Sequence, residues 1–402
     1  MQAHQDHRDL INAYDLGHIE QHSPGLIHWH PNGARVLRKL EQWVLDLHEL
    51  HDYQQVRSPA MLSKQLWEKS GHWDKYQDLM FVAGGEEDSY AVKPMSCPGQ
   101  IGIYAQRRRS YRELPYRLFE FGHVHRNEPS GALSGWMRLR GFVQDDSHVF
   151  CAVNQLQDVI GIFAGMVEQA YRAFGFEKWS WRLSLRPEKR SGDDALWDQA
   201  EGALRQACQA LGIEVVEAPG EGAFYGPKLE AAIEDRLGRQ WQCGVAQVDF
   251  VLPQRFDLEF QNAQGEREQP VLIHHAVLGS LERWLSIVME NAGCLPDWLS
   301  PHPVAVLPIG EAQEEASQAL VSKLRAHGVQ ARMIAGDPLG GRVRHAQELH
   351  FAHIGIVGAR EAQSGQVSVR QADGKSIVMD AQAWIDDVIM KCSPPALQAP
   401  VR

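Results

Sequence analysis

The sequence FGHVHRNEPSGALSGWMRLRGFVQDDSH, residues 121–148, decides the fold of this chain. A Pro-Ser-Gly sequence at 129–131 predicts a turn in its middle. Residues 118–121 before the turn are strand-like, and residues 137–142 after it alternate long apolar and basic side chains with a period near two. The stretch therefore predicts two antiparallel strands joined by a mobile loop.

This ribbon presents Arg126 and Arg138 beside an acidic, amide-rich end at 144–146. A planar guanidinium binds phosphate oxygens through two parallel hydrogen bonds, so paired arginines suit a polyphosphate ligand. The alternative is a solvated hairpin whose charges face water. Motifs elsewhere in the chain favour the phosphate site.

Composition places the chain among ordinary globular proteins. It has 402 residues, 44% of them hydrophobic and 23% charged, which leaves room for two or more cores. No apolar run approaches the roughly 20 residues of a membrane span, and the first ten residues contain no apolar signal core, so we expect a cytoplasmic location. The net charge of -11 argues against indiscriminate nucleic-acid binding and leaves a local basic face open.

Cysteine usage indicates a reducing compartment. The six cysteines contain no CxxC pair and no paired spacing, so we expect free thiols.

Strands and helices alternate over the first three quarters of the chain. The pattern predicts a mixed, mainly antiparallel sheet with flanking helices. The helices are expected at 32–50, 154–175 and 193–211, and the strands at 26–30, 90–92, 179–185, 229–233 and 240–252.

A proline-rich segment at 295–303 marks a domain boundary. Beyond it, the pattern predicts a small α/β domain of about 100 residues. Its strands are expected at 304–307, 330–334, 354–357 and 366–370, and its helices at 312–326, 342–350 and 380–391. We therefore divide the chain into a first domain at 1–300 and a second at 301–402.

A glycine-rich stretch, GEGAFYGPKLE at 220–230, interrupts the regular pattern. Its glycines permit close approach of the backbone to a ligand, and Lys228 supplies a point charge, although a plain turn explains the glycines equally well. In the strand that follows, Gln242 faces one side of the sheet, and Gln247 faces the other unless a bulge intervenes. Whether both glutamines reach one pocket is open at this point.

Three possible metal ligands come from separate segments. Cys97, His148 and His274 each fall where a strand end or loop is expected. One thiolate and two imidazoles form a plausible three-ligand zinc site with an open fourth position, although their spacing matches no local zinc-finger pattern. Taken alone, Cys97 also fits a small buried apolar residue. The candidate phosphate-binding cations are Arg126, Arg138, Lys228 and Arg283.

Six ordered motifs carry a family resemblance: KPMSCPG, HRNEPSG, MRLRGFVQDDSH, EGAFYGPK, QWQCGVAQ and IHHAVLGSLERW. They resemble the catalytic core of bacterial threonyl-tRNA synthetases, which are class II aminoacyl-tRNA synthetases, over about residues 7–301. The last hundred residues resemble the anticodon-binding domain of the family. The resemblance implies an α+β fold, with an antiparallel class II sheet and flanking helices followed by a small α/β domain. It also implies a homodimer with Pro59 in the interface.

The resemblance assigns roles residue by residue. It implies a zinc site at Cys97, His148 and His274, and an ATP site that works with Mg²⁺. In the ATP site Arg126 contacts the α-phosphate, Glu128 lies near the adenine amino group, Phe142 stacks on adenine, and Arg138 and Arg283 contact the outer phosphates. The amino-acid and adenylate pocket is implied at Gln144, Asp146, Tyr225, Lys228, Gln242 and Gln247.

The implied reaction is ATP-dependent activation of L-threonine and its transfer to tRNA-Thr. A carboxylate attacks the α-phosphorus of ATP, so such an enzyme mainly positions groups and offsets developing charge, with Arg126, Lys228 and Arg283 in the catalytic positions. The core-like sequence starts near residue 7, which leaves no room for the family's N-terminal editing domain. We therefore expect no correction of serine mischarging within this chain.

The sequence departs from the family pattern at three positions near these motifs. Ser96 replaces asparagine, Gln100 replaces histidine and His275 replaces arginine. Arg344 and Arg370 are candidates for anticodon contacts, with ordinary surface charge as the alternative. A second function therefore competes with the first: a tRNA-independent paralogue that passes threonine to a carrier protein or small molecule.

Overall fold

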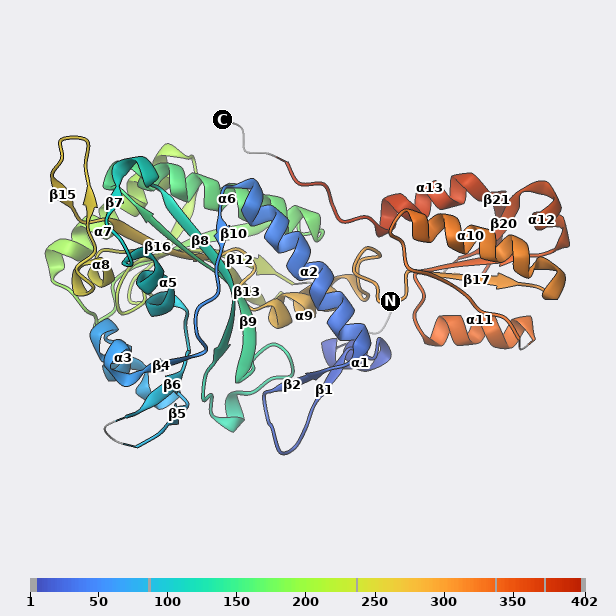
Figure 1. Cartoon of the computed structure of the whole chain (residues 1–402), viewed down its shortest axis with the longest axis horizontal. Helices are drawn as coiled ribbons and strands as arrows, with labels where there is room; N and C mark the ends of the chain where they lie inside the picture. The colour runs from blue at the N-terminus through green and yellow to red at the C-terminus, as the bar shows by residue number, and fades with distance from the viewer. Residues whose placement is uncertain (1–5, 86–87, 236–237, 337, 372–373, 399–402) are drawn as a thin grey trace. The chain divides into compact units, whose positions relative to one another are not determined.

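The computed structural model describes residues 6–85, 88–235, 238–336, 338–371 and 374–398. The chain forms two compact units (Figure 1). Of the described residues, the larger unit contains 19–27, 41–291 and 397–398. The smaller unit contains 6–18, 28–40 and 292–396.

An eight-stranded sheet forms the framework of the larger unit. Its strand order is β11-β10-β12-β13-β16-β9-β8-β3, and every pairing is antiparallel except β3 with β8 and β10 with β11. The predicted mixed, mainly antiparallel sheet is confirmed. In sheet order the strands are Val215–Ala218, Trp179–Ser184, Lys228–Glu234, Gln240–Asp249, Val271–Ala276, Gly141–Cys151, Tyr116–His125 and Gln54–Gln55.

The predicted ribbon is the pair β8 and β9, whose register joins Glu120 to Asp146 and His125 to Gly141. The second strand was predicted from residue 137, but β9 begins only at Gly141, so the prediction was wrong for residues 137–140. Met137 and Leu139 are buried at 5% and 3% exposure in the preceding loop. The period of two that suggested a strand therefore arises from loop packing.

Helices pack on the central strands. They include α2 (Pro31–Leu50), α5 (Cys97–Tyr104), α6 (Leu156–Ala173), α7 (Asp194–Ala210) and α9 (Leu281–Ala292). A hydrogen bond also joins α6 to the sheet. The Tyr171 hydroxyl on α6 accepts it from the Gly244 amide on β13, at 2.7 Å. Cys97 opens α5, which corrects the expectation that it lies on a loop.

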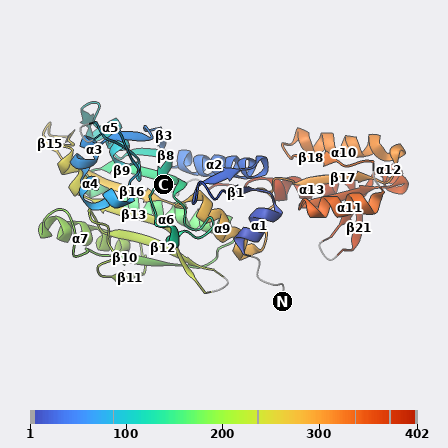
Figure 2. The same cartoon turned by 90° about the horizontal axis from the view of Figure 1, so that it is seen from below.

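The smaller unit contains a five-stranded sheet with helices on both faces (Figure 2). In the order β18-β17-β19-β20-β21 the strands are Ala331–Met333, Val304–Pro308, His353–Val357, Gln366–Arg370 and Ser376–Asp380. Helices α10 (Glu314–Ala326) and α13 (Ala381–Cys392) bury one apolar face, and α11 (Leu339–Glu348) buries the other. The α/β pattern is confirmed; strand β21 and the short helix α12 (Ala359–Ser364) were not predicted.

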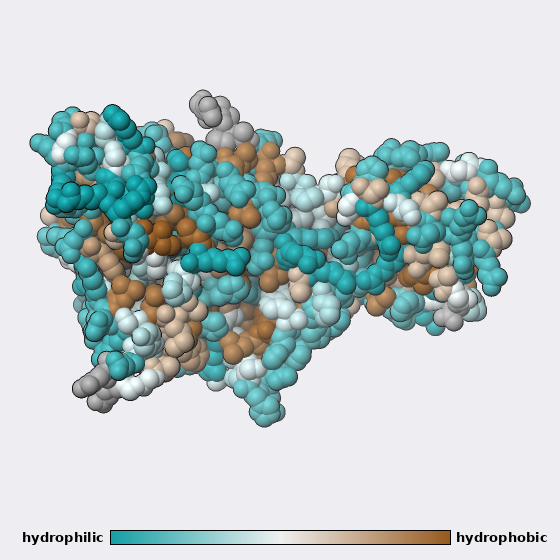
Figure 3. Space-filling model, viewed as in Figure 1, coloured by the Kyte–Doolittle hydropathy of each residue, from teal (hydrophilic) through white to brown (hydrophobic). Residues whose placement is uncertain are grey.

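Among the described residues, no helix is both long and apolar enough to cross a membrane. Hydrophilic residues cover most of the face seen in Figure 3, and hydrophobic residues gather in separate patches.

Candidate active site

The three candidate metal ligands converge in the larger unit. His148 on β9 and His274 on β16 are directly opposite each other in the sheet register, with ring centroids 4.7 Å apart. Cys97 reaches them from the first turn of α5, and one ligand atom from each residue lies within 4.8 Å of the others. Both histidines lie inside strands, so the expectation that they occupy strand ends or loops was wrong.

The chemistry of this triad fits Zn²⁺. Both ring nitrogens of His148 and Nδ1 of His274 are buried without a hydrogen-bond partner. Leaving such groups unpaired costs about 1–3 kcal/mol each, which a metal ion would offset. The second nitrogen of His274, Nε2, lies 2.9 Å from Oδ2 of Asp249, the arrangement that orients metal-bound imidazoles. A thiolate with two imidazoles is a donor set that suits zinc.

A cavity of about 520 Å³ opens next to the triad. It collects side chains from segments far apart in the sequence. His148 is fully buried and does not line it. The other catalytic, ATP-binding, substrate-binding and metal-binding residues predicted from the sequence all line it: Cys97, Arg126, Glu128, Arg138, Phe142, Gln144, Asp146, Tyr225, Lys228, Gln242, Gln247, His274 and Arg283.

Three arginines form the cationic part of the cavity. The Arg126 guanidinium lies 5.2 Å from the centroid of the Phe142 ring, and Arg138 donates a 2.8 Å hydrogen bond to Glu128. Arg283 donates from Nε to the carbonyl of Met137 at 2.8 Å. Burial, with additional repulsion from Arg126 and Arg138, lowers the pKa of Arg283. Such a cluster of three arginines, of which only Arg138 is paired with a carboxylate that lines the cavity, favours a polyanion.

Asp145 positions the start of α9, the helix that carries Arg283. Asp145 was not assigned this role from the sequence. Its buried carboxylate accepts hydrogen bonds from the amides of Val277, Leu278 and Gly279, each at 2.8 Å. Burial raises the pKa of Asp145 to about 7 although these three bonds oppose the change. The bonds fix the turn between β16 and α9, from which Arg283 reaches the cavity. The available signal was the Asp-Asp pair, of which only Asp146 was assigned.

A buried carboxylate also organises the opposite wall. Glu230, 4% exposed, pairs with Lys228 and accepts a 2.7 Å hydrogen bond from Gln242 and a 3.0 Å bond from the Ser184 hydroxyl. Sequence reasoning missed Glu230. Its position two residues after Lys228 in β12 places it on the same face of the sheet, which was the available signal.

Both glutamines line the same cavity, which settles the question that the sequence left open. The register shifts between Ala231 and Ala232, whose partners are Gly244 and Gln242, so Cys243 is an extra residue in β13. This bulge reverses the alternation of the strand and turns Gln247 to the face that Gln242 occupies.

The three departures from the family pattern surround the triad and are all buried. The Ser96 amide donates to Oδ2 of Asp146 at 3.3 Å, and the Gln100 amide group donates to the Asp146 carbonyl at 3.2 Å. His275 makes a 2.7 Å hydrogen bond with the Tyr53 hydroxyl. The Ser96 backbone and the Gln100 side chain therefore both help to hold Asp146.

His72 is a further buried residue that sequence reasoning did not select. Its ring meets the ring of Phe224 edge to face at 5.6 Å, and its Nδ1 hydrogen-bonds to the Ser70 hydroxyl at 2.8 Å. Its Nε2 has no hydrogen-bond partner. The aromatic-rich stretch around it carried the signal, but no motif tied it to the cavity.

In the smaller unit, Arg344 is exposed on α11 and Arg370 is half-buried at the end of β20. The neighbouring Arg342 is 5% exposed, and its guanidinium donates to the carbonyls of Pro308, Ile309 and Ile334. Arg342 therefore ties α11 to the sheet, whereas Arg344 is free to meet a ligand at the surface.

The mainly antiparallel eight-stranded sheet forms the core of a class II aminoacyl-tRNA synthetase. Residues 81–292 match the family model of the tRNA synthetase class II core domain (G, H, P, S and T). Residues 303–388 match the model of the anticodon binding domain.

Comparisons with individual proteins indicate which aminoacyl-tRNA synthetases this chain is similar to. The chain is 46% identical to a threonine-tRNA ligase of Dechloromonas aromatica, covering 92% of this chain and 59% of that protein. It is 44% identical to a threonine-tRNA ligase of Acinetobacter baumannii, covering 95% and 60%. The crystal structure of the RNA binding domain of threonyl-tRNA synthetase from Cryptosporidium parvum matches with a TM-score of 0.91 and 35% identity, over 98% of this chain and 99% of that chain.

The chain belongs to the threonyl-tRNA synthetase family. It spans about three fifths of the length of the curated relatives it matches.

Proposed function

We propose that this chain activates L-threonine with ATP and transfers the threonyl group to tRNA-Thr. The observation that carries the proposal is the meeting of the Cys97, His148 and His274 triad with three arginines around one cavity. The first group suits the amino acid and the second suits the phosphates of ATP.

On the ATP side the proposed roles are those that the family resemblance implies, and the lining of the cavity is consistent with them. Arg126 holds the α-phosphate, Arg138 and Arg283 hold the outer phosphates with Mg²⁺, and Glu128 and Phe142 hold the adenine. The carboxylate of threonine attacks the α-phosphorus and pyrophosphate leaves, so no protein nucleophile is needed. The arginines offset the charge that develops in this step, which is their main contribution to the rate.

On the amino-acid side the proposed contacts are polar. Lys228, held by Glu230, offsets charge on the reacting carboxylate. The remaining substrate contacts come from Gln144, Asp146, Tyr225, Gln242 and Gln247, which line the cavity next to the triad. Zinc would be held by Cys97, His148 and His274, and it would act as a Lewis acid that binds the amino and hydroxyl groups of threonine.

This arrangement predicts unequal selectivity. Valine has nearly the shape of threonine but lacks its hydroxyl group, and a site built around a polar contact strongly rejects such an analogue. Serine keeps the hydroxyl and lacks only a methyl group, which is worth about 1–3 kcal/mol. We therefore propose that the cavity activates serine at a low rate. We also propose that neither unit of this chain hydrolyses seryl-tRNA.

The proposal includes the rest of the family pattern. Residues 1–300 form the catalytic domain and 301–402 the anticodon-binding domain, where Arg344 and Arg370 contact tRNA. Two copies form a homodimer through the region of Pro59, whose side chain is exposed in the single chain. The reaction takes place in the cytoplasm, where translation consumes aminoacyl-tRNA.

A second candidate is activation of threonine without tRNA, with a carrier protein or a small molecule as acceptor. The net charge of -11 favours it, because tRNA is a polyanion. The match to an anticodon binding domain favours tRNA.

Two assays on one preparation of the zinc-containing 402-residue protein separate the candidates. Threonine-dependent ATP-pyrophosphate exchange together with charging of purified tRNA-Thr supports the ligase. Exchange without charging supports the second candidate. No threonine-dependent exchange would refute both. Incubation with preformed seryl-tRNA tests the editing proposal, because deacylation above the uncatalysed rate would contradict it.

A further inference from the structure

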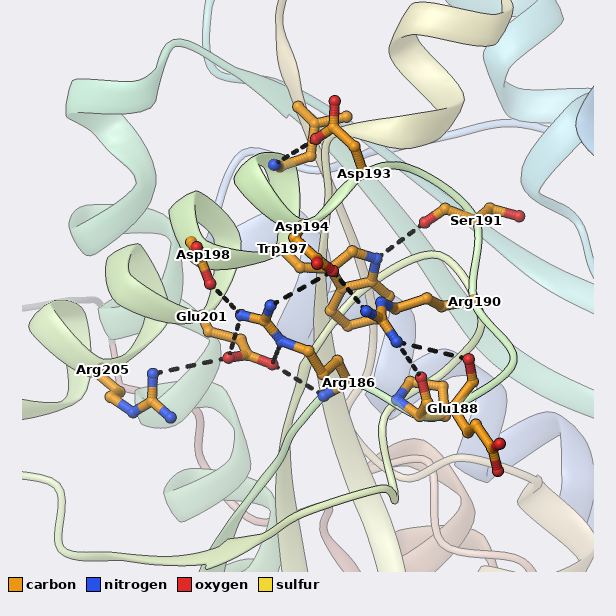
Figure 4. A network of polar contacts seen from close by, with 12 residues as sticks. Arg186, Glu188, Arg190, Ser191, Asp193, Asp194, Trp197, Asp198, Glu201 and Arg205 are labelled. Carbon is orange, nitrogen blue, oxygen red and sulfur yellow. Dashed lines mark hydrogen bonds and ion pairs between the residues drawn. The ribbon is translucent and has the colours of Figure 1, made fainter.

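A polar network lies outside the cavity, on the connection between β10 and α7 (Figure 4). The Arg186 backbone amide and Nε both donate to Oε1 of Glu201, at 2.9 and 3.0 Å, and Nη2 donates to Oε2 at 2.8 Å. Nη2 also contacts Asp198 at 2.5 Å. Burial opposes ionisation of Glu201, but the bonds from Arg186 outweigh it and lower the pKa of Glu201. The start of the connecting loop is therefore fixed to α7.

Trp197 fixes the end of the same loop. It is 2% exposed on α7, and its indole Nε1 donates a 2.8 Å hydrogen bond to the carbonyl of Ser191 (Figure 4). Arg190 donates to the Pro187 carbonyl at 3.1 Å and pairs with Asp194. The segment 186–191 has no regular secondary structure, yet side chains of α7 hold it at both ends.

The fixed loop in turn holds the glycine-rich wall of the cavity. The Ser191 amide donates a 2.7 Å hydrogen bond to the carbonyl of Phe224, and the Gly222 amide donates a 2.7 Å bond to the carbonyl of Leu185. A Cβ on residue 222 would lie 2.6 Å from that carbonyl oxygen, so only glycine permits this approach. Two backbone bonds thus join residues 185–191 to residues 222–226.

The held segment reaches the amino-acid side of the cavity. Phe224 and Tyr225 line the cavity, and the Tyr225 ring lies 5.1 Å from the ring of the metal-ligand candidate His274. None of the residues labelled in Figure 4 is a lining residue of the cavity. The network can therefore influence the substrate only through the position of this wall.

We propose that Trp197 is a positioning residue for threonine binding. Its indole N–H fixes the carbonyl of Ser191, and the amide of the same residue holds the Phe224 carbonyl and thereby sets the distance of Tyr225 from the triad. Arg186 and Glu201 support the same loop from its other end. This role rests on the proposed activation of threonine. It means that residues that touch no reacting atom affect how tightly threonine is bound.

The test uses Trp197→Phe in the full 402-residue chain, which removes the N–H donor and keeps an aromatic ring. We expect the KM for threonine in ATP-pyrophosphate exchange to rise by about 5- to 50-fold, with the KM for ATP within about twofold of wild type. Trp241→Phe is the matched control, because it removes an indole hydrogen bond of 2.7 Å to Asp235 that leads to no cavity-lining loop. The control is expected to change neither constant by more than about twofold.

Hydrogen-deuterium exchange supplies a readout that does not depend on activity. In Trp197→Phe the amides of 191 and of 222–226 are expected to exchange at least about tenfold faster, while those of β9 and β16 keep their wild-type rates. Arg186→Lys is the second variant in case Trp197→Phe does not fold. It keeps the positive charge and loses the two guanidinium hydrogen bonds to Glu201. The same faster exchange at 191 and 222–226, with unchanged rates in β9 and β16, is expected for it.

Unchanged exchange rates at 222–226, or an equal rise of both KM values, would overturn the positioning role. Absence of threonine-dependent activity in the wild-type protein would instead refute the proposed function, and the exchange rates would still decide whether Trp197 holds the loop.

Discussion

The Nε2 atom of His274 lies 2.9 Å from Oδ2 of Asp249, and both side chains are buried. This pair leaves Nδ1 of His274 as the nitrogen for a metal ion, because the carboxylate favours the tautomer with the proton on Nε2. We predict that Asp249→Asn weakens zinc binding by about 10- to 100-fold. Competition with a chromophoric chelator measures the affinity.

Asp46→Asn is the control for this variant, because Asp46 is exposed on α2 and accepts an amide hydrogen bond from Gln42. Asp249 also accepts the amides of Val251 and Leu252, so circular dichroism must confirm that the variant is folded. A folded Asp249→Asn protein with wild-type zinc affinity would show that the carboxylate does not orient the ligand.

Arg283 gives a prediction for the ATP side. It is largely buried near two further arginines, so its charge is most useful when a polyanion is bound. Arg283→Ala is expected to lower kcat/KM for ATP in the exchange assay by about 10²- to 10³-fold. Arg172→Lys, an exposed change on α6, is expected to have no effect. A reduction below about threefold for Arg283→Ala would exclude it from the phosphate site.

Gly226 and Gly202 form a matched pair for stability. A Cβ on residue 226 would lie 2.0 Å from the carbonyl oxygen of Val248, whereas one on residue 202 in α7 would meet nothing within 4 Å. Gly226→Ala is expected to destabilise the fold by about 1–3 kcal/mol, and Gly202→Ala to stabilise it by about 0.5–1 kcal/mol. Urea unfolding measures both, and equal effects would contradict the packing described for the 222–226 loop.

His48 gives a prediction for pH. It is fully buried on α2, and burial lowers its pKa to about 3, partly opposed by the Val44 carbonyl and reinforced by His51. In the unfolded chain His48 binds a proton near pH 6.5, whereas in the folded chain it stays neutral until about pH 3. Protonation therefore favours the unfolded state as the pH falls from 6.5 towards 3. The loss amounts to about 3 kcal/mol at pH 4.5.

His48→Phe removes this titration and keeps a ring against Phe119, on which His48 stacks at 3.9 Å. The variant is therefore expected to lose less stability than wild type between pH 7 and pH 4.5, measured by urea unfolding at each pH. Equal losses in the two proteins would show that His48 does not contribute to acid unfolding.

The sequence alone located most of the cavity. Turn residues and strand alternation predicted the ribbon and the glycine-rich stretch, because these signals act locally. The resemblance to a known family, carried by six short motifs, implied many of the residues that line the cavity. Register could not be predicted in the same way. The cross-strand pairing of His148 with His274 depends on which strands are neighbours, and the side that Gln247 faces depends on a bulge at Cys243.

Contacts between distant segments could not be predicted from the sequence either. Nothing local in Asp145, Glu230 or Trp197 reveals which backbone amide or carbonyl each will meet, because the partners lie in other strands and loops. Alternation also misled at 137–140, where a loop buries two apolar side chains as a strand would.

The central claim is that the triad of Cys97, His148 and His274 binds the metal that threonine activation requires. Cys97→Ser tests it when zinc content and threonine-dependent ATP-pyrophosphate exchange are measured on one sample of folded protein. We expect zinc and exchange to be lost together. Full exchange by a folded, metal-free Cys97→Ser protein would contradict it.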